Sequence, residues 1–201
     1  EIATAAACRV LGVNAFDQPD VQDNKTRTKA KIAYYQQHGT FDEGEPLWDA
    51  DGFKTYASSA LTDALQSVRD LPQTLAAFCG AVRHGDYIAI NAYVPRNPQT
   101  AALLMQLRVA LREKTGCATT VGFGPRFLHS TGQLHKGGAD NGLFLQITAD
   151  PAQDVAIPGQ GLTFGALLRG QALGDFEALQ ARNRRALRLH LSDLKLLESL
   201  V

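Results

Sequence analysis

The segment 122–138, GFGPRFLHSTGQLHKGG, gathers more side chains that could do chemistry than any other part of this sequence. Its polar and ionisable residues are Arg126, His129, Ser130, Thr131, Gln133, His135 and Lys136. Histidine titrates near neutral pH, so either histidine could move protons between sugar oxygens. The cationic side chains could hold a phosphate or a developing enolate charge, and the glycines allow close backbone approach. The pattern predicts an oxyanion or sugar-phosphate site.

A purely structural interpretation of this loop stays open. Ser130 and Thr131 could cap the backbone amides of a polar helix, and His135 could be a solvated surface residue. The density of donors favours a functional site over this alternative. The spacing from His129 to His135 is not one that metal ligands use, and no carboxylate lies at a helical offset from both, so we expect no metal here.

A second candidate is the turn NAFDQPDVQDNK at residues 14–25. Pro19 fixes the turn, and Asp17 could cap the helix that follows. Gln18 and Lys25 lie two helical turns apart and could share one side of that helix. A helical lysine is usually solvated, so spacing alone leaves both interpretations of Lys25 open. Glu113, near the end of a predicted helix, has the pattern of a solvated surface residue.

The elements that must position these residues divide the chain into three parts. Residues 1–37 contain an apolar helix that stops at Gly12 and a polar helix over 21–37. Residues 38–57, which include HGTFDEGEPLWDADGFKTY, are rich in acids and glycines and predict a connector. Residues 58–201 alternate between helical and strand patterns.

In this last part, helices are expected over 58–69, 72–85, 97–116 and 162–183, and strands over 86–94, 118–123 and 143–149. The segment RALRLHL, 185–191, fits a strand or a helical turn. Strands separated by long helices predict an α/β fold with three α/β/α layers and a mostly parallel sheet, preceded by a helical N-terminal segment. Ligands of such sheets bind beyond the carboxyl ends of strands, where segment 122–138 follows strand 118–123.

The amino-acid composition limits the kinds of binding partner that we expect for this protein. Lysine and arginine number 20, equal to aspartate and glutamate, so no basic surplus supports binding to nucleic acid or to an anionic membrane. The three widely spaced cysteines indicate free thiols in a reducing compartment, and therefore a cytoplasmic protein. No basic start of a signal peptide is visible, and the chain begins in the middle of an apolar pattern. We therefore expect a piece of a longer polypeptide.

Two segments resemble the phosphoglucose isomerase family. LGVNAFDQPDVQDNK is similar to the end of the second sugar-isomerase domain of the bacterial enzymes, with its N-x-F-x-Q-P-x-V-x-x-x-K motif. The matching residues are Asn14, Phe16, Gln18, Pro19, Val21 and Lys25. In that family the lysine assists ring opening and the glutamine contacts the sugar phosphate. The resemblance implies these roles for Lys25 and Gln18.

FLHSTGQLHKGG resembles the family's L-H-S-x-G-Q segment, whose histidine helps to open the sugar ring. This match implies that role for His129. LTFGALLRGQALGD is similar to the family's Y-T-F-G helix, which usually precedes the N-x-F-x-Q-P motif, whereas here it follows. The reversed order resembles the C-terminal part of bifunctional transaldolase/phosphoglucose isomerases, which carry an additional sugar-isomerase-like unit. Under this resemblance the fold of 58–201 is a sugar-isomerase-like unit and 1–37 ends a preceding domain.

The family's base is missing from this chain. That glutamate lies in an E-S-x-G-K motif, and the nearest match here is the run EKTG at 113–116. We expect the true glutamate upstream of residue 1, together with the phosphate-binding loops and the charge-stabilising arginine. The chain alone then holds an incomplete active site.

The reaction implied is aldose–ketose isomerisation of glucose 6-phosphate and fructose 6-phosphate, a glycolytic step that needs no cofactor or metal. His129 and Lys25 would be catalytic. The implied or expected substrate-binding residues are Gln18, Arg126, Ser130, Thr131, Gln133, His135 and Lys136. Expected partners are a sugar phosphate, the remainder of the parent polypeptide and, in a homo-oligomer, further copies of the chain. The alternative is a non-catalytic module that binds a sugar phosphate or only packs against the catalytic part, and the substituted EKTG favours it.

Overall fold

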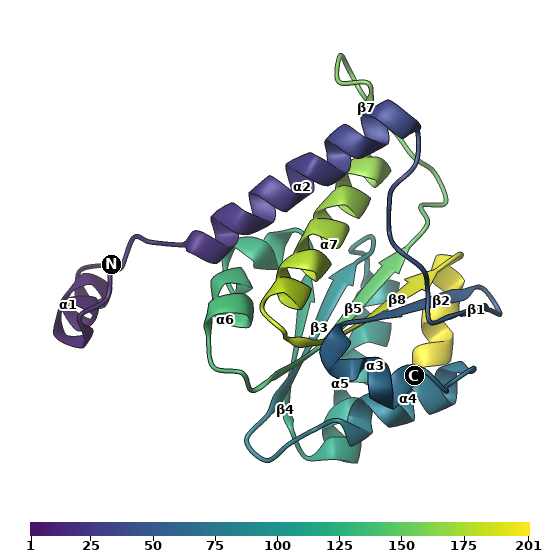
Figure 1. Cartoon of the computed structure of the whole chain (residues 1–201). Coiled ribbons are helices and arrows are strands. Elements are labelled where there is room, and N and C mark those ends of the chain that lie inside the picture. Colours follow the sequence, from purple (N-terminus) through teal and green to yellow (C-terminus); the bar gives the residue numbers. More distant parts are fainter.

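A single twisted sheet forms the centre of the computed structural model, which describes residues 1–201. Its strand order is β1-β2-β8-β5-β3-β4 (Figure 1). The strands are β1 (Trp48–Ala50), β2 (Phe53–Ala57), β3 (Tyr87–Tyr93), β4 (Ala118–Phe123), β5 (Gly142–Ala149) and β8 (Arg185–Leu191). The four strands from β8 to β4 are parallel, and β1 and β2 extend the sheet as an antiparallel hairpin.

Helices cover both faces of this sheet. One face carries α3 (Ser59–Leu65), α4 (Leu71–Gly80), α5 (Pro98–Thr115) and the 3₁₀ segment η2 (Leu194–Leu200). The other carries α6 (Gly132–Gly137) and α7 (Phe164–Ala181), and α2 (Pro19–His38) packs on the outer side of these two helices (Figure 1). A 3₁₀ turn, η1 (Arg126–His129), precedes α6, and a short hairpin of β6 (Ala156–Ile157) and β7 (Leu162–Thr163) precedes α7.

The alternation of strand side chains decides what each face buries. In β8, the leucines at 187, 189 and 191 enter the large apolar core shared with α3, α4 and α5. The intervening Arg188 and His190 are buried on the α7 face, where the apolar clusters are smaller. The α7 face therefore buries charged side chains, and both candidate regions described below lie on it.

The connections of the sheet reverse direction between β3 and β5. The chain leaves β3 through α5 to reach β4 on one side, and it leaves β5 through α7 to reach β8 on the other. Because α5 and α7 cover opposite faces, the connections that follow β3 and β5 diverge around a crevice. Such a switch point is where open α/β sheets bind ligands.

The predicted α/β/α fold with a mostly parallel sheet and a preceding helical segment is confirmed. Segment 185–191 is a central strand, and the helix expected to reach Gly85 ends at Gly80. The connector prediction is wrong at 48–57, which forms β1 and β2. Asp51 and Gly52, with φ of 54° and 81°, make the tight turn between these strands. The turn-forming residues of this hairpin therefore resembled those of a connector in composition.

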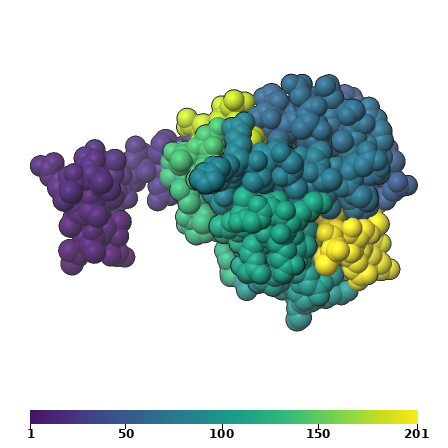
Figure 2. Space-filling model, turned by 90° about the horizontal axis from the view of Figure 1, so that it is seen from below, coloured from purple at the N-terminus to yellow at the C-terminus, as the bar shows by residue number.

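The N-terminal helix α1 (Ile2–Leu11) ends at Gly12, as predicted, and buries none of its residues. It lies apart from the rest of the molecule (Figure 2). The three cysteines are free thiols, as the sequence indicates. None of the helices combines the length and apolar character needed to cross a bilayer.

Candidate functional site

A cavity of about 270 Å³ opens between α2, η1, α6 and α7. It is lined by Asp20, Val21, Asn24, Lys25, Thr28, Lys29, Leu128, His129, Gly132, Lys136 and Gln171. More than half of these residues come from α2 at helical spacing, so one side of that helix forms a wall. Most of the lining residues are polar or charged, although most of the surface that they present to the cavity is carbon.

Lys25 and His129 both line this cavity although they come from distant parts of the chain. Lys25 projects from α2, and His129 is the last residue of η1. Both side chains are exposed, so neither is committed to the core. The fold thus brings together the two residues that the sequence singled out as catalytic.

One lining residue, Lys136, forms a buried ion pair behind the cavity wall. The ammonium of Lys136 lies 2.5 Å from Oδ1 of Asp175, and both side chains are almost fully buried. Asn24 donates to the same oxygen at 3.3 Å, and Gln146 donates to Oδ2 at 3.3 Å. Because the charge of Lys136 is already neutralised, Lys136 contributes more to holding α2, α6, α7 and β5 together than to attracting an anion.

Other predicted binding residues also have partners within the fold. The amide of Gln133 donates to Oδ2 of Asp20 at 2.6 Å and accepts from the Asp20 backbone amide at 3.1 Å. The hydroxyls of Ser130 and Thr131 donate to the carbonyl of Phe127 at 3.2 and 3.4 Å. Gln133 therefore ties α6 to the first turn of α2, while Ser130 and Thr131 close the turn before α6. None of the three lines the cavity.

His135 lies inside the molecule rather than in the cavity. Its ring packs between Phe127 and Phe144, with centroid distances of 5.8 and 5.1 Å. Burial lowers the pKa of His135 from 6.5 to about 4, so the ring is neutral at neutral pH. Gln18 immediately precedes α2 and Arg126 begins η1, and both are exposed and outside the cavity lining.

Sequence reasoning missed Asp20, Asn24, Thr28, Lys29 and Gln171 as lining residues. A helical projection from Lys25 would have found Thr28 and Lys29, which lie one turn further along the same side. No local pattern identifies Gln171, because its position depends on the packing of α7 against α2.

The only carboxylate in the cavity lining is Asp20, which is already paired. Its Oδ1 lies 2.6 Å from the guanidinium of Arg182, and its side chain is 3% exposed. Glu113 is exposed near the end of α5, on the opposite face of the sheet. The cavity therefore contains a histidine and two lysines at its mouth but no free carboxylate base.

No family model and no curated protein matches the chain. Among solved structures, it is similar to a hypothetical protein from Thermus thermophilus, with a TM-score of 0.54 and 20% sequence identity. The aligned region covers 70% of this chain and 41% of that protein, so the chain spans about two fifths of its length. At this identity the likeness concerns the fold alone.

Proposed function

We propose that this chain forms part of a sugar-phosphate site in an aldose–ketose isomerase that interconverts glucose 6-phosphate and fructose 6-phosphate. The supporting observation is that Lys25 and His129 line one cavity. Each belongs to a separate segment that resembles the phosphoglucose isomerase family.

The two residues would have different roles in ring opening. His129 exchanges a proton with the ring oxygen or the anomeric hydroxyl, a role that suits an exposed imidazole. Lys25 holds the phosphate or the oxygen that gains charge as the ring opens, with Lys29 one turn away adding to the field. The proton transfer between C2 and C1 then requires a carboxylate. We assign it to the remainder of the parent polypeptide, because Asp20 is occupied.

The first test measures binding of fructose 6-phosphate to the chain by calorimetry. Lys25→Ala and His129→Ala are each expected to weaken binding about tenfold, the scale of a lost charge-assisted hydrogen bond. The matched controls are Lys114→Ala and His84→Ala, which alter exposed residues outside the cavity. Equal affinity in the cavity variants and the controls would reject the site.

The second test measures isomerase turnover in the full-length parent protein. His129→Ala should lower turnover by about 10²-fold or more, as expected of an acid–base group, and His84→Ala should leave it unchanged. This prediction concerns chemistry, so it separates catalysis from binding alone.

A non-catalytic sugar-phosphate-binding module is the second candidate. The observation in its favour is the absence of a free carboxylate in the cavity lining. Under this alternative His129→Ala weakens fructose 6-phosphate binding but leaves turnover at the wild-type level. Either function fits a cytoplasmic protein of sugar-phosphate metabolism, and a homo-oligomer would be one way to supply the missing base.

A further inference from the structure

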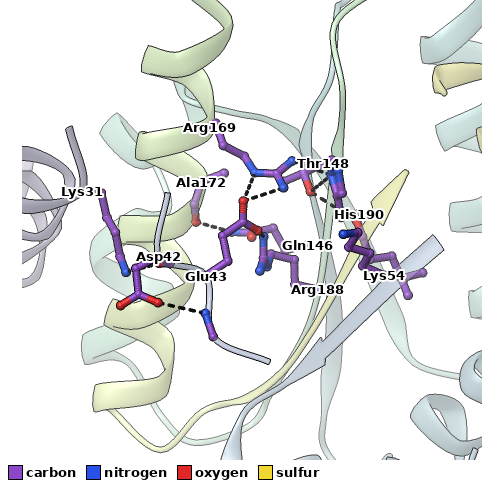
Figure 3. Close-up of polar contacts among 12 residues, drawn as sticks. Lys31, Asp42, Glu43, Lys54, Gln146, Thr148, Arg169, Ala172, Arg188 and His190 are labelled. Carbon is purple, nitrogen blue, oxygen red and sulfur yellow. Dashed lines mark hydrogen bonds and ion pairs between the residues drawn. The ribbon is translucent and has the colours of Figure 1, made fainter. Parts of the chain in front are cut away.

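A second polar cluster lies away from Lys25 and His129, centred on Glu43 (Figure 3). Oε1 of Glu43 accepts hydrogen bonds from Arg169, with N···O distances of 2.8 Å to Nε and 2.7 Å to the terminal nitrogen. Its Oε2 accepts from Arg188 at 2.6 Å. The carboxylate thus occupies a fork between two guanidinium groups.

The two arginines are fixed by the fold around them. Arg188 is 1% exposed in its side chain and packs 3.7 Å from the ring centroid of Tyr56. Arg169 lies 2.5 Å from Nδ1 of His190, which also hydrogen-bonds to Thr148. These contacts hold both guanidiniums in place from the side away from Glu43. The fork is therefore preorganised, and its geometry suits the oxygens of a carboxylate or phosphate.

Positive charge exceeds negative charge in this fork. Burial acts to raise the pKa of Glu43, but the charges and hydrogen bonds of Arg188 and Arg169 leave it below 4.5, so the group is an anion. Burial and the charge of Arg169 lower the pKa of His190 to about 4, so its ring is neutral. Asp150 lies 3.9 Å from Arg169 and is 60% exposed, which weakens its contribution. One partly buried carboxylate therefore faces two cations, the partly buried Arg169 and the fully buried Arg188.

The Arg169 side of the fork lies beside the switch point of the sheet. The adjoining cavity of about 290 Å³ is lined by Tyr93 at the end of β3, by Pro95 after it, by Thr148 and Ala149 at the end of β5, and by Arg169. Two further hollows, of about 340 and 500 Å³, border it, and Glu43 lines all three. The strap that carries Glu43, residues 39–47, therefore divides one larger groove.

The strap is held mainly by side chains. Between Thr40 and Pro46 no backbone group makes a backbone–backbone hydrogen bond. Gly39 and Gly44 adopt positive φ values of 72° and 71°, and a Cβ at either would meet no atom within 4 Å. Besides Glu43, the main links are the Lys31 ammonium, which donates to the carbonyl of Asp42 at 2.7 Å, and the stacking of Phe41 on Tyr35. Withdrawal of the Glu43 carboxylate thus breaks few other interactions.

We propose that Arg169 and Arg188 form a binding site for a phosphate group. In the absence of phosphate the Glu43 carboxylate occupies this site, and a bound phosphate displaces it. A phosphate dianion matches the charge of two guanidiniums better than one carboxylate does, and the flanking hollows leave room for the withdrawn side chain. The site is separate from the cavity of Lys25 and His129, since the linings share no residue.

The test measures binding of inorganic phosphate and of glycerol 3-phosphate by calorimetry, in a Lys25→Ala background that weakens the first site. Glu43→Gln abolishes the competing charge and should tighten phosphate binding about tenfold or more. Glu45→Gln makes the same charge change two residues along the strap, at an exposed residue that forms no ion pair with an arginine, and should change nothing. Arg169→Gln, made together with Glu43→Gln, should remove the gain.

The proposal fails if Glu43→Gln and Glu45→Gln bind phosphate equally, or if the gain survives Arg169→Gln. If Glu43→Gln does not fold, the proposal is tested by comparing phosphate binding in the chain that keeps Glu43, with and without Arg169→Gln. That chain should bind phosphate at millimolar concentration, and Arg169→Gln should not. Equal affinities for the two probes assign the site to the free ion, and tighter binding of the ester assigns it to a phosphorylated metabolite.

Discussion

His129 and His135 are close in the chain but have opposite environments. His129 is exposed at the mouth of the cavity, whereas His135 is enclosed by two phenylalanine rings and its Nδ1 has no hydrogen-bond partner. Burying a charged imidazole without a partner is costly, so folding selects the neutral form of His135. The same residue type is thus exposed at the mouth of a cavity at one position and is an aromatic core residue at the other.

This difference predicts a pH dependence of stability. The pKa of His135 is about 4 in the folded state against 6.5 for a free histidine, so the unfolded chain binds more protons between these values. The stabilisation is fully present above pH 6.5 and is lost as the pH falls towards 4. Replacing His135 by Phe should therefore reduce the loss of unfolding free energy between pH 7 and pH 5 by about 2 kcal/mol.

Urea unfolding at the two pH values measures this effect, with the exposed His84→Phe as the control. His190, whose pKa is also lowered to about 4, adds the same dependence to all variants and cancels in the comparison. An acid sensitivity of His135→Phe equal to that of His84→Phe would contradict the assignment.

At the residue scale, the sequence identified where donors gather but not where they point. It singled out Lys25 and His129, and the fold brings both to one cavity. It could not show that Lys136 faces Asp175, because that contact depends on a helix almost forty residues later. The fork around Glu43 was missed for the same reason, since its members come from three separate elements and form no motif.

At the scale of elements, two glycines allow α2 to approach α7. A Cβ at Gly170 would lie 2.6 Å from Cδ1 of Ile32. A Cβ at Gly174 would lie 2.8 Å from the backbone nitrogen of Thr28 and 2.7 Å from its hydroxyl. The side-chain atom of Ile32 can move, whereas the backbone of α2 can move only as a whole helix. Gly174 therefore sets the spacing of the helix that carries Lys25.

Gly174→Ala should destabilise the protein by about 1–3 kcal/mol despite the better helix propensity of alanine. The matched control is Gly80→Ala at the end of α4, where an added Cβ meets nothing within 4 Å and stability should stay the same or rise slightly. Urea unfolding compares the two. Equal stability of the two variants would show that α2 adjusts without cost.

The elements themselves followed from local patterns because periodicity and helix-stop glycines act over a few residues. The strand predicted over 118–123 and the helix ended by Gly116 agree with the structure. The hairpin at 48–57 was missed because its strands are short, although the Asp51-Gly52 pair is a strong hairpin signal. RALRLHL was ambiguous because it is only seven residues long, which also fits a helical turn, although Leu187–Leu191 alternates between leucines and polar residues as a strand does.

At the scale of the whole molecule, the sheet and its two helical layers form a unit from which α1 stands apart (Figure 2). The apolar side chains of this segment are open to solvent, including Ile2, Val10 and Leu11 at 89%, 87% and 73% exposure. Exposed apolar surface of this kind contributes nothing to the free energy of folding, because its exposure hardly changes when the rest of the chain unfolds.

A chain that lacks residues 1–13 should therefore keep the unfolding free energy of the full chain to within about 0.5 kcal/mol. It should also bind fructose 6-phosphate with the same affinity, because the cavity lining begins at Asp20. Urea unfolding and calorimetry of the two chains measure both quantities. A loss of more than about 1 kcal/mol would mean that α1 packs on the sheet unit in solution, since only buried surface can stabilise the folded state.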